Sequence, residues 1–377
     1  MRAILCALCL AGCAAREHEQ RIETTSGAIA VANLSAQIDG QEQSLRRRPG
    51  AVPAMAALVE LLQTRAQYTG SVCDFRRMER LGEEAVRLSP RDPQALLVRA
   101  STRAALHRFA AALSDLDAAG DDAAAPSLRA SILQAQGRNA EALELRRRAV
   151  REYANTRNLA ALAAAEGAAG DFAGALRDFT AAERAYRDTS PFPLAWIDFQ
   201  RGLVFERQGH LDDARAAYAA AADRLPQFAQ AQAHLAGMLA LRGDRRRAEA
   251  ILRPLAGLDD PEYEGQLAGL LASSEEGARL RASAAERYES LLRGFPEAFA
   301  DHAARFFLAF DPARALSLAR LDVQVRPTLE AFDLALSAAV ASGAIDCSLA
   351  ARARAAAPES KRIELMAART CMCSGAP

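Results

Sequence analysis

The sequence predicts an all-α protein: a right-handed superhelical solenoid of about nine helix–turn–helix hairpins. Three observations lead to this prediction. A loop position returns about every 34 residues, the residues after it keep fixed offsets, and no run alternates β-branched and polar residues as a strand would. Apolar residues make up 51% of the chain but aromatics only 6%, because alanine supplies much of the difference. Small side chains of this kind suit closely packed helices.

The repeat unit is clearest in ERQGHLDDARAAYAAAADRLPQ, residues 206–227. Ala214 and Ala221 are one heptad apart and therefore share a helix face, with Tyr218 on the same stripe. Gly209 permits a tight turn before this helix, and Pro226 marks the end of the helix. The stretch is therefore predicted to be the second helix of a hairpin.

Equivalent loop positions occur on both sides of Gly209. They are Cys73, His107, Gly137, Gly170, Gly243, Phe310 and Gly343, with room for one more unit between Gly243 and Phe310. In the first helix of a hairpin, a small residue lies seven positions before the loop and a large one four before it, as Gly202 and Phe205 do. In a solenoid of such hairpins, each one is expected to pack only on its neighbours.

This pattern resembles the tetratricopeptide repeat (TPR) over roughly residues 52–358, most specifically at 195–228 and 229–257. The resemblance implies a non-catalytic scaffold that binds a peptide or helix of a partner in a concave groove lined by the first helices. It also implies that four positions of each unit face this groove; the residues expected there are Trp196, Phe199, Leu203, Glu206, Glu297 and Phe307. Alternatively, Trp196 and Phe199 pack the inserted SPFPL loop onto the solenoid.

The first residues, MRAILCALCLAGC, have the short apolar core of a secretory signal. The LAGC stretch resembles a bacterial lipobox, which implies that Cys13 is acylated and becomes the mature N-terminus. The protein is then expected at the periplasmic face of the bacterial cell envelope, attached to the membrane by lipid. Residue 14 is alanine rather than aspartate, which by the sorting rule of enteric-type bacteria favours the outer membrane. The predicted organisation is a signal peptide (1–12), a tether with a possible helix (13–50), the solenoid (51–358), and a cap and tail (359–377).

The remaining cysteines suggest one disulfide. Cys347 opens the second helix of the last hairpin, and a returning capping helix would bring Cys371 and Cys373 close to it. A bridge from Cys347 to one of the two is therefore expected. Cys73 is expected to fill a helix–turn interface as a small hydrophobe. Two thiolates one residue apart do not form a closed metal site, so no metal or cofactor is expected.

No segment matches a nucleophile, phosphate-loop, zinc-protease or dinucleotide motif. Asp301 and His302 are neighbours, but a helix-start cap by Asp301 explains them more simply than an acid–base pair. His107 and His210 are expected to be solvated loop residues. The 47 basic and 47 acidic residues balance, which argues against nucleic acid as a partner. The predicted partner is a protein of the cell envelope; the alternative function is periplasmic capture of a small ligand or metal for transport or sensing.

Overall fold

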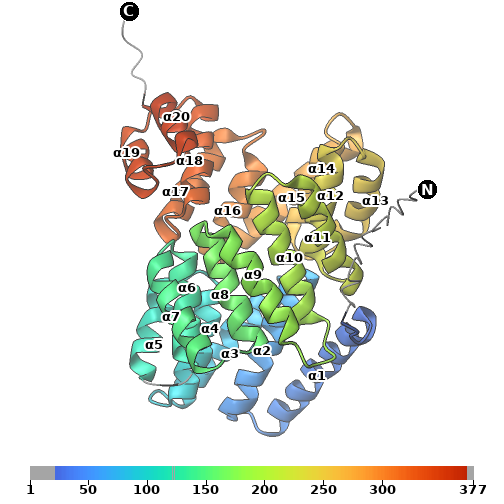
Figure 1. Cartoon of the computed structure of the whole chain (residues 1–377), viewed down its shortest axis with the longest axis vertical. Helices are drawn as coiled ribbons and strands as arrows, with labels where there is room; N and C mark the ends of the chain where they lie inside the picture. Colours follow the sequence, from blue (N-terminus) through green and yellow to red (C-terminus); the bar gives the residue numbers. More distant parts are fainter. Residues whose placement is uncertain (1–21, 121, 123, 372–377) are drawn as a thin grey trace, which may run out of the picture.

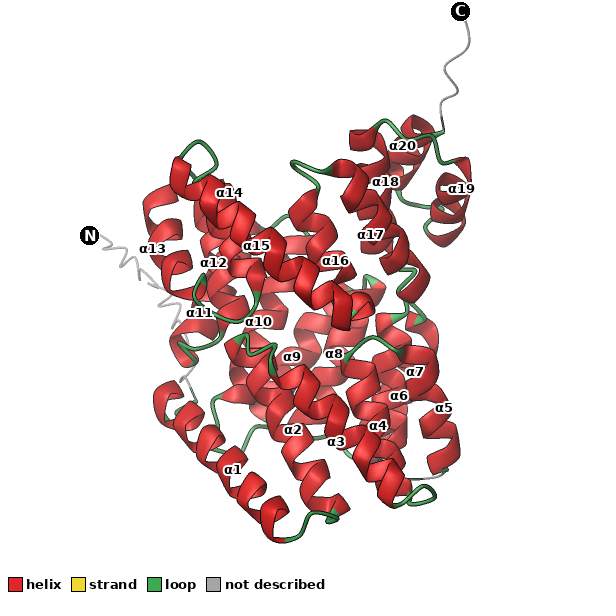
Figure 2. Ribbon diagram, turned by 180° about the vertical axis from the view of Figure 1, so that it is seen from behind, coloured by secondary structure: helices red, strands yellow, loops and turns green. Residues whose placement is uncertain are grey.

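The structure is a computed structural model that describes residues 22–120, 122 and 124–371, and in this part of the chain it contains helices but no strand (Figure 2). The helices are α1 (Gly27–Arg47), α2 (Val52–Thr69), α3 (Asp74–Leu88), α4 (Pro93–Ala105), α5 (Phe109–Ala119), α6 (Ala125–Ala135), α7 (Asn139–Glu152), α8 (Thr156–Ala169), α9 (Phe172–Arg184), α10 (Phe192–Arg207), α11 (Leu211–Arg224), α12 (Ala229–Leu241), α13 (Arg245–Leu255), α14 (Pro261–Leu270), α15 (Glu275–Gly294), α16 (Pro296–Phe307), α17 (Pro312–Val325), α18 (Leu329–Ser342), α19 (Cys347–Ala356) and α20 (Lys361–Thr370).

The helices from α2 to α19 form nine hairpins that follow one another along the chain, beginning with α2 and α3 and ending with α18 and α19 (Figure 1). Helix α1 packs against α2 at one end, and α20 packs on α18 and α19 at the other. The fold is therefore an all-α superhelical solenoid, as the sequence predicts.

The hairpin at 192–224 shows why the repeat pattern produces this fold. Gly209 lies in the turn between α10 and α11 with a φ of 76°, a conformation that costs glycine little because it has no Cβ. Ala214, Tyr218 and Ala221 are fully buried. A Cβ on Gly202 would lie 2.4 Å from the ring of Tyr218, so the small residue of α10 makes room for the large residue of α11.

The unit between Gly243 and Phe310 keeps the helix packing of the other hairpins, but its two helices differ in length. Helix α14 has ten residues and α15 has twenty. Ser274 caps α15 by accepting a hydrogen bond from the backbone N–H of Gly277 at 3.0 Å. Tyr288 is still buried, at 1% exposure, because the extra turns lie ahead of it in α15. The early start of α15 explains why the repeat offsets slip in this unit.

The hairpins do not pack only on their neighbours, and this part of the prediction was wrong. The hydroxyl of Tyr68 in α2 donates a hydrogen bond to the carbonyl of Phe192 at 3.0 Å, and its ring centroid lies 4.8 Å from that of Phe228. Further along, Nδ1 of His107 lies 3.2 Å from the carbonyl oxygen of Glu297, 190 positions away in sequence. Successive turns of the superhelix therefore touch; in Figure 1, the lower end of α17 lies next to the teal helix α6.

His107 is a contact residue between these turns and not a solvated loop residue. It has a φ of 56°, and it is the one non-glycine residue with positive φ in the part of the chain that the structure describes. Its ring stacks on Phe109 with centroids 5.3 Å apart. Burial lowers the pKa of His107 to about 4, and the charge of Arg326 acts in the same direction. His210 is exposed, as expected.

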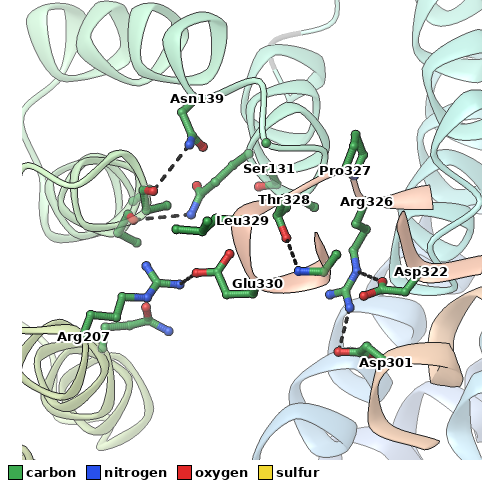
Figure 3. Close-up of a pocket in the computed structure, with 18 of the residues that line it drawn as sticks. Ser131, Asn139, Arg207, Asp301, Asp322, Arg326, Pro327, Thr328, Leu329 and Glu330 are labelled. Carbon is green, nitrogen blue, oxygen red and sulfur yellow. Dashed lines mark hydrogen bonds and ion pairs between the residues drawn. The ribbon is translucent and has the colours of Figure 1, made fainter. Parts of the chain in front are cut away.

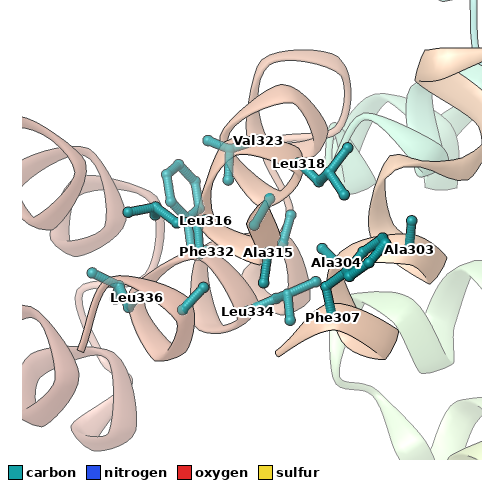
Figure 4. Packing of buried hydrophobic residues seen from close by; sticks show 14 of the residues in the cluster. Ala303, Ala304, Phe307, Ala315, Leu316, Leu318, Val323, Phe332, Leu334 and Leu336 are labelled. Atoms are coloured by element: carbon teal, nitrogen blue, oxygen red, sulfur yellow. The ribbon is translucent and has the colours of Figure 1, made fainter. Parts of the chain in front are cut away.

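The C-terminal hairpins share a continuous apolar core (Figure 4). Phe307 of α16 lies in this core near Leu334 of α18, and Leu316 of α17 lies beside Phe332 of α18 elsewhere in the same core. Phe307 is only 6% exposed. It therefore stabilises the packing of α16 on its neighbours. The expectation that its side chain faces the groove was wrong.

The cysteines follow the prediction only in part. Cys347 and Cys371 form a disulfide, which is one of the two pairings that the sequence left open. The backbone N–H of Asp346 donates to the carbonyl of Thr370 at 3.1 Å, so α20 returns to the start of α19. Cys73 is exposed with a free thiol and fills no interface. Cys13 and Cys373 lie outside the described residues.

Candidate functional site

A groove of about 1,400 Å³ follows the inner face of the C-terminal half of the solenoid. Its walls come mainly from the first helices of successive hairpins, α10, α12, α14, α16 and α18, together with parts of α13 and α20. Leu203, Leu241 and Leu270 supply apolar surface, and Gly237 and Gly269 leave the wall open. The groove is thus a surface that five consecutive hairpins build together.

Most charged side chains in this groove pair with one another across neighbouring helices. Glu206 of α10 accepts a hydrogen bond from the hydroxyl of Tyr218 at 2.5 Å and lies 3.3 Å from Nδ1 of His234 in α12. Its hydrogen bond to His234 holds the pKa of Glu206 below its usual value. Glu262 of α14 lies 2.8 Å from Nδ1 of His302 in α16. These pairs neutralise most of the groove wall and fix the spacing of its helices.

Asp301 does not cap a helix, contrary to the prediction. It lies within α16, whose N-cap residue is Phe295. Asp301 Oδ2 lies 2.6 Å from a guanidinium nitrogen of Arg326, and Oδ1 lies 3.7 Å from Nε2 of His302. Burial alone would raise the pKa of Asp301, but the charges of His302 and Arg326 hold it well below its usual range. The charge of Asp301 in turn raises the pKa of His302 to about 10.

A second cavity, of about 790 Å³, lies between the two turns of the superhelix (Figure 3). Helices α6, α7, α8 and α10 form one side of it, and α16 to α19 with the α17–α18 loop form the other. The ion pair between Arg207 of α10 and Glu330 of α18, at 3.0 Å, connects the two sides. Both residues also line the large groove, so the two spaces adjoin at this pair.

Of the six residues expected in the groove, Leu203 and Glu206 line it. Trp196 lines the adjoining cavity between the turns instead. Phe199, at 6% exposure, is buried among Tyr218 and Phe228. Phe307 is in the core described above, and Glu297 faces neither space. The Oε2 atom of Glu297 is instead buried without a hydrogen-bond partner in the described structure. The expectation was therefore wrong for Phe199, Phe307 and Glu297.

Two charged residues that the sequence analysis did not single out occupy core positions of the repeat. Arg146 is the ninth residue after Gly137, and the equivalent positions hold buried residues in other hairpins: Leu116, Phe179, Tyr218 and Leu252. Glu166 lies four before Gly170, where other first helices have Phe205, Leu239 and Phe306. Both charged residues are 7% exposed. The break in the pattern was visible in the sequence and could have identified them.

The polar atoms of Arg146 and Glu166 have hydrogen-bond partners to different degrees. Arg146 donates to the hydroxyls of Ser127 and Ser131 of α6, at 3.0 and 2.6 Å, while its Nε has no partner in the described structure. Glu166 also has an orphaned buried oxygen, Oε2. Burial raises the pKa of Glu166 to about 7, and the nearby carboxylate of Asp178 adds to this shift.

Among residues 22–120, 122 and 124–371, no group of three histidine, cysteine, aspartate or glutamate side chains is arranged to hold a metal ion. None of the helices in these ranges is both long and apolar enough to cross a membrane.

No protein-family model and no curated protein matches the chain. Several solved structures are similar in fold. The Cut9–Hcn1 hetero-tetramer of the APC/C gives a TM-score of 0.45 at 13% identity, over 91% of this chain and 74% of that one. A human IFIT1 dimer with PPP-AAAA gives 0.46 at 15%, over 87% and 77%. The C-terminal part of a TPR repeat-containing protein from Cytophaga hutchinsonii gives 0.32 at 15%, over 63% and 97%. These likenesses concern the fold alone.

Proposed function

We propose that the protein is a non-catalytic adapter that binds a peptide or helix of a partner protein in its inner groove. The observation that carries this proposal is the size and construction of the groove. At about 1,400 Å³ it exceeds the roughly 300–1,000 Å³ typical of small-molecule sites, and it extends along five hairpins. A long groove with an apolar wall and paired charges suits a segment of chain better than a compact ligand.

The wall of the groove has the features that such a segment requires. Leu241 is 70% exposed at the groove, so it offers apolar surface to a partner side chain. A Cβ added to Gly237 or Gly269 would meet no atom within 4 Å, which shows that the space in front of α12 and α14 is open. The partner segment would lie across these two helices.

We further propose that acylation of Cys13 tethers the adapter to the envelope of a bacterium, with the groove on the periplasmic side and the outer membrane as its site. The support is the LAGC stretch at residues 10–13. Cys13 with two or more acyl chains would give stable attachment, since one chain alone holds a protein only marginally. The partner would then be another envelope protein. The intact mass of the protein purified from membranes tests this, because an unmodified Met1 and no acyl mass would contradict it.

The groove is tested by filling it. Gly237→Trp places a large side chain in open space, and replacing a helical glycine does not lower helix propensity. Tagged protein with this change should lose the partner captured from envelope extract by at least tenfold and should melt like the wild type. Gly40→Trp is the matched control, because Gly40 is also a helical glycine with an open Cβ position but lies in α1, outside the groove. Equal capture by folded Gly237→Trp and Gly40→Trp proteins would contradict the proposal.

A further inference from the structure

Arg146 of α7 is a buried cation in a position that the fold normally fills with an apolar side chain. It is 7% exposed, and its equivalents in other hairpins are Leu116, Phe179, Tyr218 and Leu252. No carboxylate among the described residues forms an ion pair with it; its two partners are the neutral hydroxyls of Ser127 and Ser131. Burying a cation without a counter-charge is unfavourable, and a leucine would fill the same position at no such cost.

Arg146 lines the cavity between the two turns. A guanidinium has five N–H groups. Ser127 and Ser131 take one each from the two terminal nitrogens, and the Nε–H is enclosed, so each terminal nitrogen keeps one N–H for another acceptor. A carboxylate has two oxygens that can accept from the two terminal nitrogens of a guanidinium.

The other charges that line this cavity support an anionic occupant. Arg326 is paired with Asp301 and Asp322, and Arg207 is paired with Glu330. The cavity lining thus has four arginines and three acidic residues. Arg146 and the exposed Arg305 are the two arginines of this lining without an ion-pair partner among the described residues. A single negative charge would balance this surplus.

We propose that the cavity between the superhelical turns binds a carboxylate, with Arg146 as its main charged contact. This deepens the proposed function and rests on it: the carboxylate belongs to an aspartate or glutamate side chain of the partner segment that occupies the adjoining groove. The two spaces meet at Arg207 and Glu330, so a segment in the groove can place an acidic side chain in the cavity. A free small carboxylate has the same chemistry and is the alternative source.

Binding in the cavity can be followed by tryptophan fluorescence, because Trp196 lines the cavity and is the one tryptophan of the chain. Its fluorescence is followed while the protein is titrated with the blocked peptide acetyl-Leu-Ala-Glu-Ala-Leu-amide, with the same peptide carrying glutamine, and with glutarate. The glutamate peptide should change the emission saturably and bind at least tenfold more tightly than the glutamine peptide. A response to glutarate without any preference between the peptides would support the carboxylate site but overturn its assignment to a partner segment.

Arg146→Leu installs the residue that two other hairpins have at this position. It should weaken binding of the glutamate peptide at least tenfold while the melting temperature stays the same or rises. Arg148→Leu is the matched control, because Arg148 lies on the same helix with a side chain that is 72% exposed and should bind as the wild type does. A lower melting temperature with unchanged binding would make Arg146 a structural residue and overturn the proposal.

Two results keep this test separate from the test of the groove. If Arg146→Leu does not fold, the comparison of glutamate and glutamine peptides on the wild type still decides, since equal binding of both overturns the proposal. If Gly237→Trp leaves partner capture intact while carboxylate binding still depends on Arg146, the groove proposal fails and the carboxylate site stands.

Discussion

The hairpins α10–α11 and α6–α7 have the same backbone arrangement, but an equivalent buried position holds an aromatic side chain in the first and a charged one in the second. In α10–α11, Tyr218 fills the space above Gly202, and its hydroxyl reaches Glu206 at the groove. In α6–α7, the equivalent residue is Arg146, which is 7% exposed. Its guanidinium donates hydrogen bonds only to the hydroxyls of Ser127 and Ser131. The first arrangement satisfies both packing and hydrogen bonding, whereas the second leaves a charge without a counter-charge.

The difference teaches which departures from a repeat pattern carry information. A repeat position that is buried in most hairpins accepts an apolar or aromatic side chain there because the neighbouring helix must cover it. A charged residue there is unfavourable for folding, and so it points to a role outside folding. Glu166, in the hairpin α8–α9 that lies between the other two, is a second buried charge, at a position where other hairpins have the half-buried Phe205, Leu239 and Phe306. The following predictions test the comparison, from the largest expected effect to the smallest.

The largest effect is expected at Tyr218. Tyr218→Ala should lower the free energy of unfolding by about 3–5 kcal/mol, because it empties a fully buried site between α10 and α11. Urea unfolding followed by circular dichroism measures this. Tyr153→Ala is the matched control: Tyr153 is 70% exposed, and its loss should change stability by about 0.5 kcal/mol or less. Similar losses for the two variants would show that the hairpin does not depend on its buried tyrosine.

Glu166→Gln should have an intermediate effect that depends on pH. The pKa of Glu166 is about 7 in the folded protein, against an ordinary value of 4.5, so stability falls as pH rises from about 4.5 through 7. The amide carries no charge at any pH. The variant should therefore be more stable than the wild type by about 2 kcal/mol at pH 8, while the two should be similar at pH 4.5.

Thermal melts of both proteins across this pH range measure the difference. Glu144→Gln is the control, since the Glu144 side chain is 71% exposed and the change should have no comparable pH dependence. A stability gain for Glu166→Gln that is equal at pH 4.5 and pH 8 would rule out titration of Glu166 as the cause.

The smallest effect concerns the loops of the two compared hairpins. Gly137 and Gly209 have φ values of 73° and 76°, so alanine is strained at both and should cost about 1 kcal/mol at Gly209. A Cβ on Gly209 would meet nothing, whereas one on Gly137 would lie 3.2 Å from the carbonyl oxygen of Pro327 in the next turn. Gly137→Ala should therefore destabilise more than Gly209→Ala in urea unfolding. Equal losses would mean that the contact between the turns adjusts freely.

The candidate site was predictable only in part. The repeat offsets predict the groove for Leu203 and Glu206, which line it, and for Trp196, which lines the adjoining cavity instead. They fail for Phe199 because an offset gives the face of a helix but not what covers that face, and Phe228 from the next hairpin covers this one. Arg146 could have been recognised from the sequence as an exception, but its partners on α6 and the cavity in front of it could not.

The sequence by itself determined the helical hairpins, their number and their loops, because these depend on residues close together in the chain. Glycine at positive φ, small residues opposite large ones and prolines at helix ends act within one or two hairpins. Only the tertiary structure decided that His107 meets Glu297 and that Gly137 faces Pro327. The rotation from each hairpin to the next is small and adds up over many hairpins, so local patterns do not specify which turns touch or what space they enclose.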